Sequence, residues 1–241
     1  MNHPNKKAGS STRKRAESLQ KSLSLVLILG LIIVIIIFFI TLDQGLMMKL
    51  GPGVLLVLMI IIKILPDVLD KQSKKVDKLE RRAVRGAVAE EKIGELLEDL
   101  GPDFLVFHDV SSRFGNIDHV VLGKECGVIL IETKSHHGHV SFSGDTLLVN
   151  GKYPEKDFIL QTNKNTYWIR DQIGEVVGFN PWIISLIVFT NAFVEAHKPV
   201  KSVSVINKKF LRQFIQSKSK YSPQNLKVWE KREEIEKLLS S

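Results

Sequence analysis

The sequence predicts an α/β protein in two parts: an N-terminal transmembrane helical hairpin, then a mixed-sheet domain with helices on both faces. Three observations predict it. Two apolar stretches lie close together near the N-terminus, strand-like runs separated by turns follow, and helical periodicity brackets those runs. The expected boundaries are a basic cytoplasmic tail (1–22), a transmembrane region (23–65), a basic linker helix (66–82), an α/β domain (83–197) and a basic C-terminal extension that completes or flanks the domain (198–241).

The positive charge of the chain is unevenly distributed. The 241 residues carry a formal net charge of +8, and residues 1–83, with 14 Lys or Arg and 6 Asp or Glu, account for all of it. This excludes a uniformly basic DNA-coating protein, and 44% hydrophobic residues exclude a disordered chain. A single cysteine, Cys126, excludes a disulfide framework and a multi-cysteine zinc module.

The first apolar stretch, 23–42, is long enough to cross a membrane. Its 20 residues carry no charge, and a helix of that length spans a hydrocarbon core of about 30 Å. The alternative is a cleaved signal peptide, which has a shorter apolar core of about 7–15 residues and a small-residue cleavage site. No alanine lies between Ala16 and Ala83, so we expect a retained membrane helix.

The second stretch, 46–65, is weaker because it contains Lys49, Lys63 and a Gly-Pro-Gly sequence. We expect a second crossing with the lysines near the interfaces; the alternative is one crossing plus an interfacial or re-entrant segment. Basic residues flank both ends of the pair, which predicts an integral two-pass protein in the lipid bilayer with both termini and the domain cytoplasmic.

The elements of the soluble part follow from periodicity and breaker residues. A helical pattern over 67–100 stops at Gly101-Pro102. Three strand-like runs come next, and the third begins with four apolar residues, as expected of a central strand buried on both faces. The expected strands are 104–110, 116–122, 127–134, the short pair 140–142 and 147–149, then 182–190 and 200–206; the expected helices are 157–177, 208–215 and 223–239.

Charged residues interrupt two of the apolar strands. Asp118 begins one, and Glu132 follows four apolar residues in the next. Lys134 points to the same face as Glu132, because strand side chains alternate. If the strands are neighbours, Asp118 lies beside Glu132, and the two carboxylates form a plausible Mg²⁺ site. The simpler interpretation is a solvent-facing cross-strand ion pair.

Several segments together resemble the nuclease-related domain (NERD) family of the PD-(D/E)XK nuclease superfamily. They are Gly86-x3-Glu90, Gly115-Asn-Ile-Asp118-His119, Gly127-Val-Ile-Leu-Ile-Glu132-Thr-Lys134, Gly138 and Gln161. The resemblance covers about 83–192 and implies a restriction-endonuclease-like core. It also implies that Glu90, Asp118, Glu132 and Lys134 form the acidic and lysine site, with Gln161 contacting that site or the substrate backbone.

Two departures from the family pattern affect the helix carboxylate. Ala89 replaces a glycine that family members often carry directly before it, and Glu91 adjoins Glu90, so the assignment could slip by one residue. Alanine favours the helix, so the first change is structurally harmless.

The leading hypothesis is a membrane-anchored, cytoplasm-facing nuclease that depends on Mg²⁺ or Mn²⁺ and cleaves DNA or RNA. Asp118, Glu132 and Glu90 are its expected metal ligands, and the catalytic set adds Lys134 and Gln161. The alternative is a non-catalytic membrane scaffold or nucleic-acid-binding module that reuses the fold. A third, weaker hypothesis is a sensor of anionic lipid surfaces.

Other candidates have simpler interpretations. We expect His136, His137 and His139 in a turn around Gly138 rather than at a metal, and Cys126 to have no catalytic role. Tyr167 and Trp168 are expected in core packing rather than base stacking. The basic C-terminal extension is either a solvated amphipathic segment or a contact for phosphate or anionic lipid.

Overall fold

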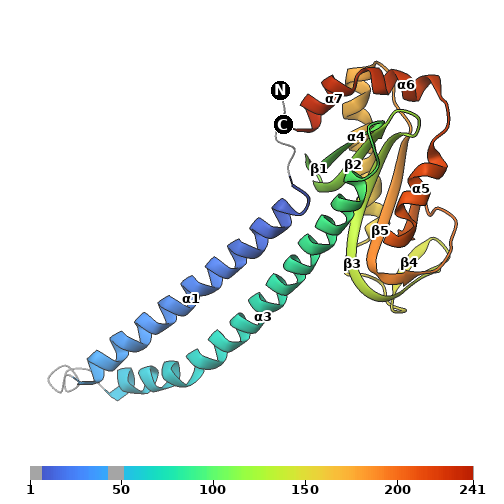
Figure 1. Cartoon of the computed structure of the whole chain (residues 1–241). Helices are drawn as coiled ribbons and strands as arrows, with labels where there is room; N and C mark the ends of the chain where they lie inside the picture. The colour runs from blue at the N-terminus through green and yellow to red at the C-terminus, as the bar shows by residue number, and fades with distance from the viewer. Residues whose placement is uncertain (1–6, 43–51, 241) are drawn as a thin grey trace. The chain divides into compact units, whose positions relative to one another are not determined.

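The computed structural model describes residues 7–42 and 52–240 (Figure 1). Its residues form two compact units. Residues 12–84 form a helical unit, and residues from 85 onward form a mixed α/β unit that also includes the segment before residue 12. The two units are described separately.

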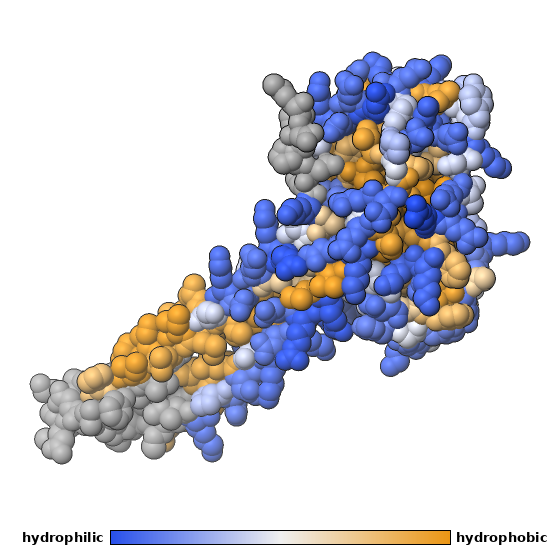
Figure 2. Space-filling model, in the orientation of Figure 1, coloured by the Kyte–Doolittle hydropathy of each residue, from blue (hydrophilic) through white to orange (hydrophobic). Residues whose placement is uncertain are grey.

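The helical unit contains α1 (Ser10–Leu42) and the greater part of α3 (Pro52–Glu98). The two helices touch, because a Cβ added at Gly30 would lie 2.8 Å from the Leu69 side chain. Apolar side chains gather along α1 (Figure 2). In the described part of the chain, one segment, Ser10–Ile33, is long and apolar enough to cross a membrane. Only 11% of the residues in its most apolar stretch are buried.

The second expected membrane stretch is only partly described. Residues 46–51 lie outside the described residues, and 52–65 form the beginning of α3. The expected boundary between the transmembrane region and the linker helix, at 65/66, is not a helix end. Pro66 lies inside α3, which is one helix of 47 residues. Proline suits the first turn, where Pro52 lies, because the amide hydrogen it lacks has no helical partner there.

The α/β unit is built on one mixed sheet in the order β1-β2-β3-β5-β6, with β4 paired to β3. The first three strands form an antiparallel meander, whereas β5 runs parallel to β3 and β6 parallel to β5. The mixed α/β architecture is therefore as expected. The strands are β1 (Phe104–Ser112), β2 (Gly115–Gly123), β3 (Gly127–Ser143), β4 (Thr146–Val149), β5 (Ile183–Val194) and β6 (Val203–Asn207).

Helices cover both faces of this sheet, because alternate strand residues are apolar on both sides. On one face, Val128 and Leu130 of β3 pack with α4 (Phe158–Val177), α6 (Pro223–Glu230) and α7 (Arg232–Leu239). On the other, Ile129 and Ile131 pack with the end of α3 and with α5 (Leu211–Lys218), which follows a short 3₁₀ turn, η1 (Lys208–Phe210). The basic C-terminal segment thus supplies core residues to both faces.

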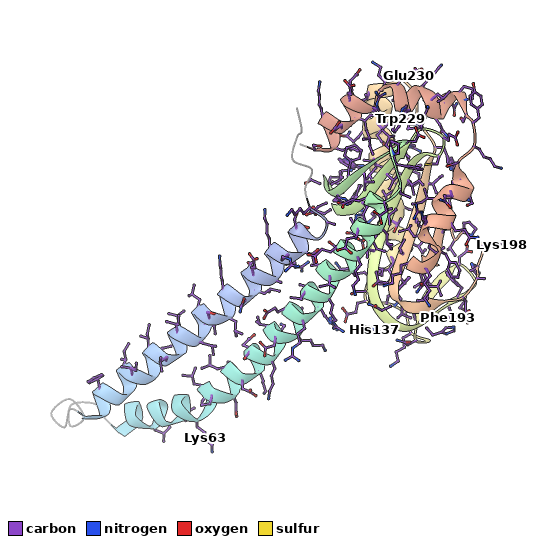
Figure 3. All side chains as sticks on the ribbon, viewed as in Figure 1. Lys63, His137, Phe193, Lys198, Trp229 and Glu230 are labelled. Carbon is purple, nitrogen blue, oxygen red and sulfur yellow. The ribbon has the colours of Figure 1, made fainter. Side chains whose placement is uncertain are left out.

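The boundaries of β3 and of the C-terminal helices also differ from the expected ones. The turn expected around Gly138 lies inside β3, which is 17 residues long with an irregularity between Lys134 and His137. The strand continues because β3 pairs with β5 both before and after this irregularity. Gly138 adopts a φ of +92°, which residues with a side chain disfavour. The single helix expected over 223–239 is two helices that meet at Lys231. In Figure 3, Trp229 of α6 lies at the opposite end of the sheet from His137 and Phe193.

Candidate functional site

The site begins where the pairing of β2 with β3 stops. The last paired residues are His119 and Ile131. Beyond them, the Asp118 carboxylate accepts a hydrogen bond from the Thr133 amide at 2.6 Å. A side chain therefore occupies a place in the ladder where a backbone carbonyl would normally accept, and Asp118 is held against the strand that carries Glu132 and Lys134.

Glu132 is the most buried of the charged residues at this position, with 3% of its surface exposed. Its Oε1 accepts two hydrogen bonds, from Lys134 Nζ at 2.7 Å and from Gln161 Nε2 at 3.1 Å. Its Oε2 is buried and has no hydrogen-bond partner within the described part of the chain. Leaving a buried carboxylate oxygen unpaired costs free energy, so a hydrogen-bond donor or a cation bound to this atom would stabilise the site.

The charges of the site act strongly on one another. Burial raises the pKa of the Asp118 carboxyl well above its usual range, and the negative charges of Glu132 and Glu90 raise it further. Lys134 and the Thr133 amide oppose this rise only in part. Burial lowers the pKa of Lys134, but the charges of Glu132 and Asp118 outweigh that effect and raise it. Lys134 is therefore a cation at neutral pH.

Glu90 comes to the same site from α3. It lies on the half-buried side of that helix, between the buried Ala89 and the turn that carries Ile93. Its charge raises the pKa of both Asp118 and Lys134, so the Glu90 carboxylate lies within electrostatic range of both. Hydrogen bonds thus bring Asp118, Glu132, Lys134 and Gln161 together from β2, β3 and α4, and Glu90 of α3 acts on them through its charge.

The donor set suits a hard divalent cation with few protein ligands. Carboxylate oxygens are what Mg²⁺ prefers, and it commonly uses one or two and retains several waters. The described residues contain no group of three or more His, Cys, Asp or Glu side chains close enough to hold a metal ion together. In chemical type, the carboxylates of Asp118 and Glu132 suit Mg²⁺ more than zinc, whose structural sites are built mainly from Cys and His.

Sequence reasoning missed Phe158, whose ring lies 4.7 Å from Lys134 Nζ. At this distance the face of the ring attracts the ammonium group electrostatically. Phe158 is held by the first turn of α4, which Asp157 caps by accepting the Leu160 amide hydrogen bond at 2.9 Å. The sequence signal for this was Asp157, an aspartate directly before an apolar helical pattern, which marks Phe158 as the first residue of the helix.

A second polar cluster is centred on Asp109 of β1, which lies across from Asp118 in the pairing of β1 with β2. Asp109 is 5% exposed and adopts a left-handed φ of 57°. Its carboxylate accepts hydrogen bonds from the Ser10 and Ser11 hydroxyls, the Ser11 amide and the Asn116 side chain, at 2.5–2.7 Å. These bonds lower the pKa of Asp109 although burial alone would raise it. We call this cluster the N-terminal clasp, because it holds residues 10 and 11 against the sheet.

A histidine pair also lies beside the site. His108 and His119 approach through their Nδ1 atoms at 2.8 Å, so one ring must donate and the other accept. Burial lowers the pKa of both rings, which keeps the pair neutral. No sequence pattern pairs residues on separate strands before the register is known.

The remaining sequence candidates take simple structural positions. His139 Nε2 lies 3.0 Å from the Glu195 carboxylate, and the His139 ring stacks on Phe193. Burial raises the pKa of the Cys126 thiol to about 11, which is unsuitable for a nucleophilic thiolate. Trp168 packs against the core as expected, but Tyr167 is exposed, so core packing is wrong for that residue.

Comparison with known proteins gives one match. The family model described as NERD, nuclease-related domain, matches residues 85–190. That range contains all five residues of the site. Comparison with curated proteins and with solved structures found no significant match.

Proposed function

We propose that this chain is a membrane-anchored nuclease that hydrolyses phosphodiester bonds in DNA or RNA with the help of Mg²⁺ or Mn²⁺. The observation that carries the proposal is the state of Glu132. One of its oxygens is held by Lys134 and Gln161, while the other is buried and unpaired within the described part of the chain. The match to the nuclease-related domain model supports a nucleic-acid substrate.

Asp118 and Glu132 would hold the metal ion, with Glu90 contributing directly or through water. A bound divalent ion would supply a water of lowered pKa and would neutralise charge on the phosphate. It would also relieve the repulsion that raises the pKa of Asp118. The chain itself keeps the Glu132 carboxylate in one orientation through the hydrogen bonds to its Oε1.

Lys134 would act beside the carboxylates that hold the metal ion. In the metal-free protein the charges of Glu132 and Asp118 raise the pKa of Lys134, which favours its protonated ammonium group. From its position beside Glu132 it can orient the attacking water by donating a hydrogen bond or stabilise charge that develops on the phosphate. Gln161 can hold the same carboxylate or contact the substrate backbone.

The test is a cleavage assay of full-length protein on DNA and RNA with Mg²⁺ or Mn²⁺. Asp118→Ala and Lys134→Ala should each lower the rate by about 100-fold or more, as removal of a charge-stabilising group does in other enzymes. Glu175→Ala, an exposed carboxylate on α4, is the control and should retain the wild-type rate. Full activity in both site variants would rule out the assignment.

A second candidate function is a nucleic-acid-binding module or membrane scaffold without catalysis. It is favoured by the lack of a three-ligand cluster among the described residues. Calorimetric titration with Mg²⁺ separates the two functions: a nuclease should bind the ion in the wild type and lose binding in Asp118→Asn. Nucleic-acid binding without metal binding or turnover would favour the module.

The proposed anchor is a two-pass hairpin with both ends cytoplasmic. The length and apolar character of α1 support one crossing. The N-terminal clasp supports an even number of crossings, because Ser10 and Ser11 contact Asp109 of the α/β unit and the tail and the domain must then share one side. The basic residues that flank both stretches favour the cytoplasm as that side.

A further inference from the structure

A small pocket lies between α4, the start of β5 and the turn before β6. Its volume is about 120 Å³, well below the roughly 300–1,000 Å³ of clefts that take drug-sized ligands, so it suits a single flat ring system. Two aromatic side chains at its edge are open to solvent: Trp182 is 72% exposed and Tyr167 is 56% exposed.

The pocket is separate from the candidate active site. Gln161 and Tyr167 are six residues apart on α4, which places their side chains about 120° apart around the helix and about 9 Å apart along it. Gln161 reaches Glu132, whereas Tyr167 lines the pocket. A molecule in the pocket is therefore not in the position of the bond to be cleaved.

The floor of the pocket offers a hydrogen-bond acceptor. Thr166 donates its hydroxyl proton to the Thr162 carbonyl at 2.8 Å. In the 2.7 Å contact between Thr166 and Ser185, Ser185 must then be the donor. The Ser185 oxygen keeps its lone pairs, and an acceptor in this place suits an amino group on the ring of a ligand.

The rim of the pocket is cationic. Arg170 lies 5.1 Å from the Tyr167 ring and is paired with Asp171 at 2.8 Å, so it supports the ring more than it adds free charge. Lys201 is exposed in a two-residue turn closed by the hydrogen bonds between Val200 and Val203. Lys201 and Ser202 both have positive φ, at 47° and 69°, where glycine or asparagine is usual. The turn presents Lys201 to the pocket.

We propose that this pocket binds an unpaired nucleobase, with Trp182 and Tyr167 as the stacking surface and Lys201 beside the adjoining phosphate. An exposed aromatic face, a cation and a buried acceptor correspond to the ring, the phosphate and the amino group of such a ligand. The base comes from a free nucleotide or from a single strand; in a duplex it is paired and stacked inside. This binding goes beyond the proposed hydrolysis and does not require it.

The test uses full-length protein in detergent micelles without divalent metal, so that cleavage does not interfere. The probes are AMP, a short adenine-rich single-stranded oligonucleotide and its blunt duplex. Tryptophan fluorescence should be quenched by the single strand or by AMP, and much less by the duplex. Quenching by AMP alone identifies a free nucleotide as the ligand, and quenching by the strand alone identifies an unpaired base within a chain.

Variants separate stacking from charge. Trp182→Ala should weaken binding about 5- to 150-fold, the range for loss of one base–aromatic stack, whereas Trp182→Phe should keep it when binding is followed by anisotropy of a labelled strand. Lys201→Gln should reduce the slope of affinity against salt by about one unit, which Trp182→Ala should not. Tyr221→Ala, 78% exposed and outside the pocket, is the matched control.

Three results would overturn the proposal: unchanged affinity in Trp182→Ala, equal affinity for duplex and single strand, or no binding of either AMP or the strand. Because every measurement is made without metal, failure here is distinct from failure of the cleavage assay.

Discussion

At the residue scale, Asp118 carries the largest electrostatic cost of the candidate site. Its carboxylate is held close to Glu132 and Glu90 with one lysine to offset them. A carboxyl whose folded-state pKa lies above its unfolded value destabilises the fold when ionised. That penalty is fully present above the folded pKa, shrinks as the pH falls below it, and is gone below the unfolded pKa of about 3.9.

Asp118→Asn should therefore stabilise the metal-free protein at pH 7–8 while it removes cleavage. Each kcal/mol gained should raise the melting temperature by about 2–4 °C in a protein of this size. Thermal unfolding at pH 8 and pH 5 checks the sign, since the advantage should shrink in acid. Asp145→Asn, in an exposed turn, should change neither temperature. A less stable Asp118→Asn protein at pH 8 would contradict this account.

Ionisation of Asp109 has the opposite effect on stability: it stabilises the fold. Its four hydrogen bonds lower its pKa, so the stability it provides is present above the unfolded pKa of about 3.9 and is lost as the pH falls through the lower folded value. Asp109→Ala should cost about 2–3 kcal/mol at pH 7, because buried donors lose a charged acceptor.

Urea unfolding at pH 7 and pH 3 measures this effect. The double variant Ser10→Ala, Ser11→Ala should reproduce part of the loss, and Asp103→Ala, which is exposed, should show none. If Asp109→Ala unfolds like the wild type at pH 7, the N-terminal clasp contributes nothing to stability.

At the scale of elements, α4 connects the candidate active site with the nucleobase pocket. Its first turn carries Phe158 and Gln161, and its later turns carry Tyr167 and Arg170. Asp157 caps this helix, and Gly178 ends it with a left-handed φ of 80°. The position of both sites therefore depends on where α4 begins.

Asp157→Ala should destabilise the domain by about 0.5–2 kcal/mol, the usual cost of losing an N-cap. It should also lower cleavage activity, because the turn that places Phe158 over Lys134 frays. Chemical unfolding and the cleavage assay report the two effects. Asp157→Asn restores a capping oxygen and should recover most of both, whereas equal losses in the two variants would exclude a capping role.

At the scale of the whole molecule, charge is divided by region. The excess of positive charge belongs to residues 1–83, whereas the five site residues lie in a part of the chain rich in carboxylates. Under the proposed topology, the net charge of +8 would bear on membrane orientation more than on attraction to nucleic acid. Attraction of a nucleic-acid substrate to the proposed site would then come from a bound cation and from local lysines and arginines.

Membrane insertion and sidedness can be measured directly. Full-length protein should stay in membranes washed with alkaline carbonate, and in sealed right-side-out vesicles both the tail and the domain should resist added protease. Inverted vesicles should expose both. Cleavage of one end alone would contradict an even number of crossings, and release by carbonate would contradict an integral anchor.

Much of the fold could be predicted from local patterns. Apolar runs separated by turn-like stretches, together with the helix stop at Gly101-Pro102, predicted the first three strands and the helix before them, because burial on two faces dictates composition. The strand across Gly138 was missed, since pairing with β5 rather than local preference extends it. The break at Lys231 was likewise hidden by one continuous amphipathic pattern.

The sequence by itself determined which residues carry charge inside apolar strands, since Asp118, Glu132 and Lys134 interrupt runs that must be buried. Only the tertiary structure decided what those charges do. The strand register brings Asp118 to Thr133, α4 brings Gln161 and Phe158 to the same place, and the Glu132 oxygen is left buried and unpaired within the described residues. The physical reason is distance: periodicity is local, whereas electrostatic coupling and hydrogen bonding depend on contacts between residues far apart in the chain.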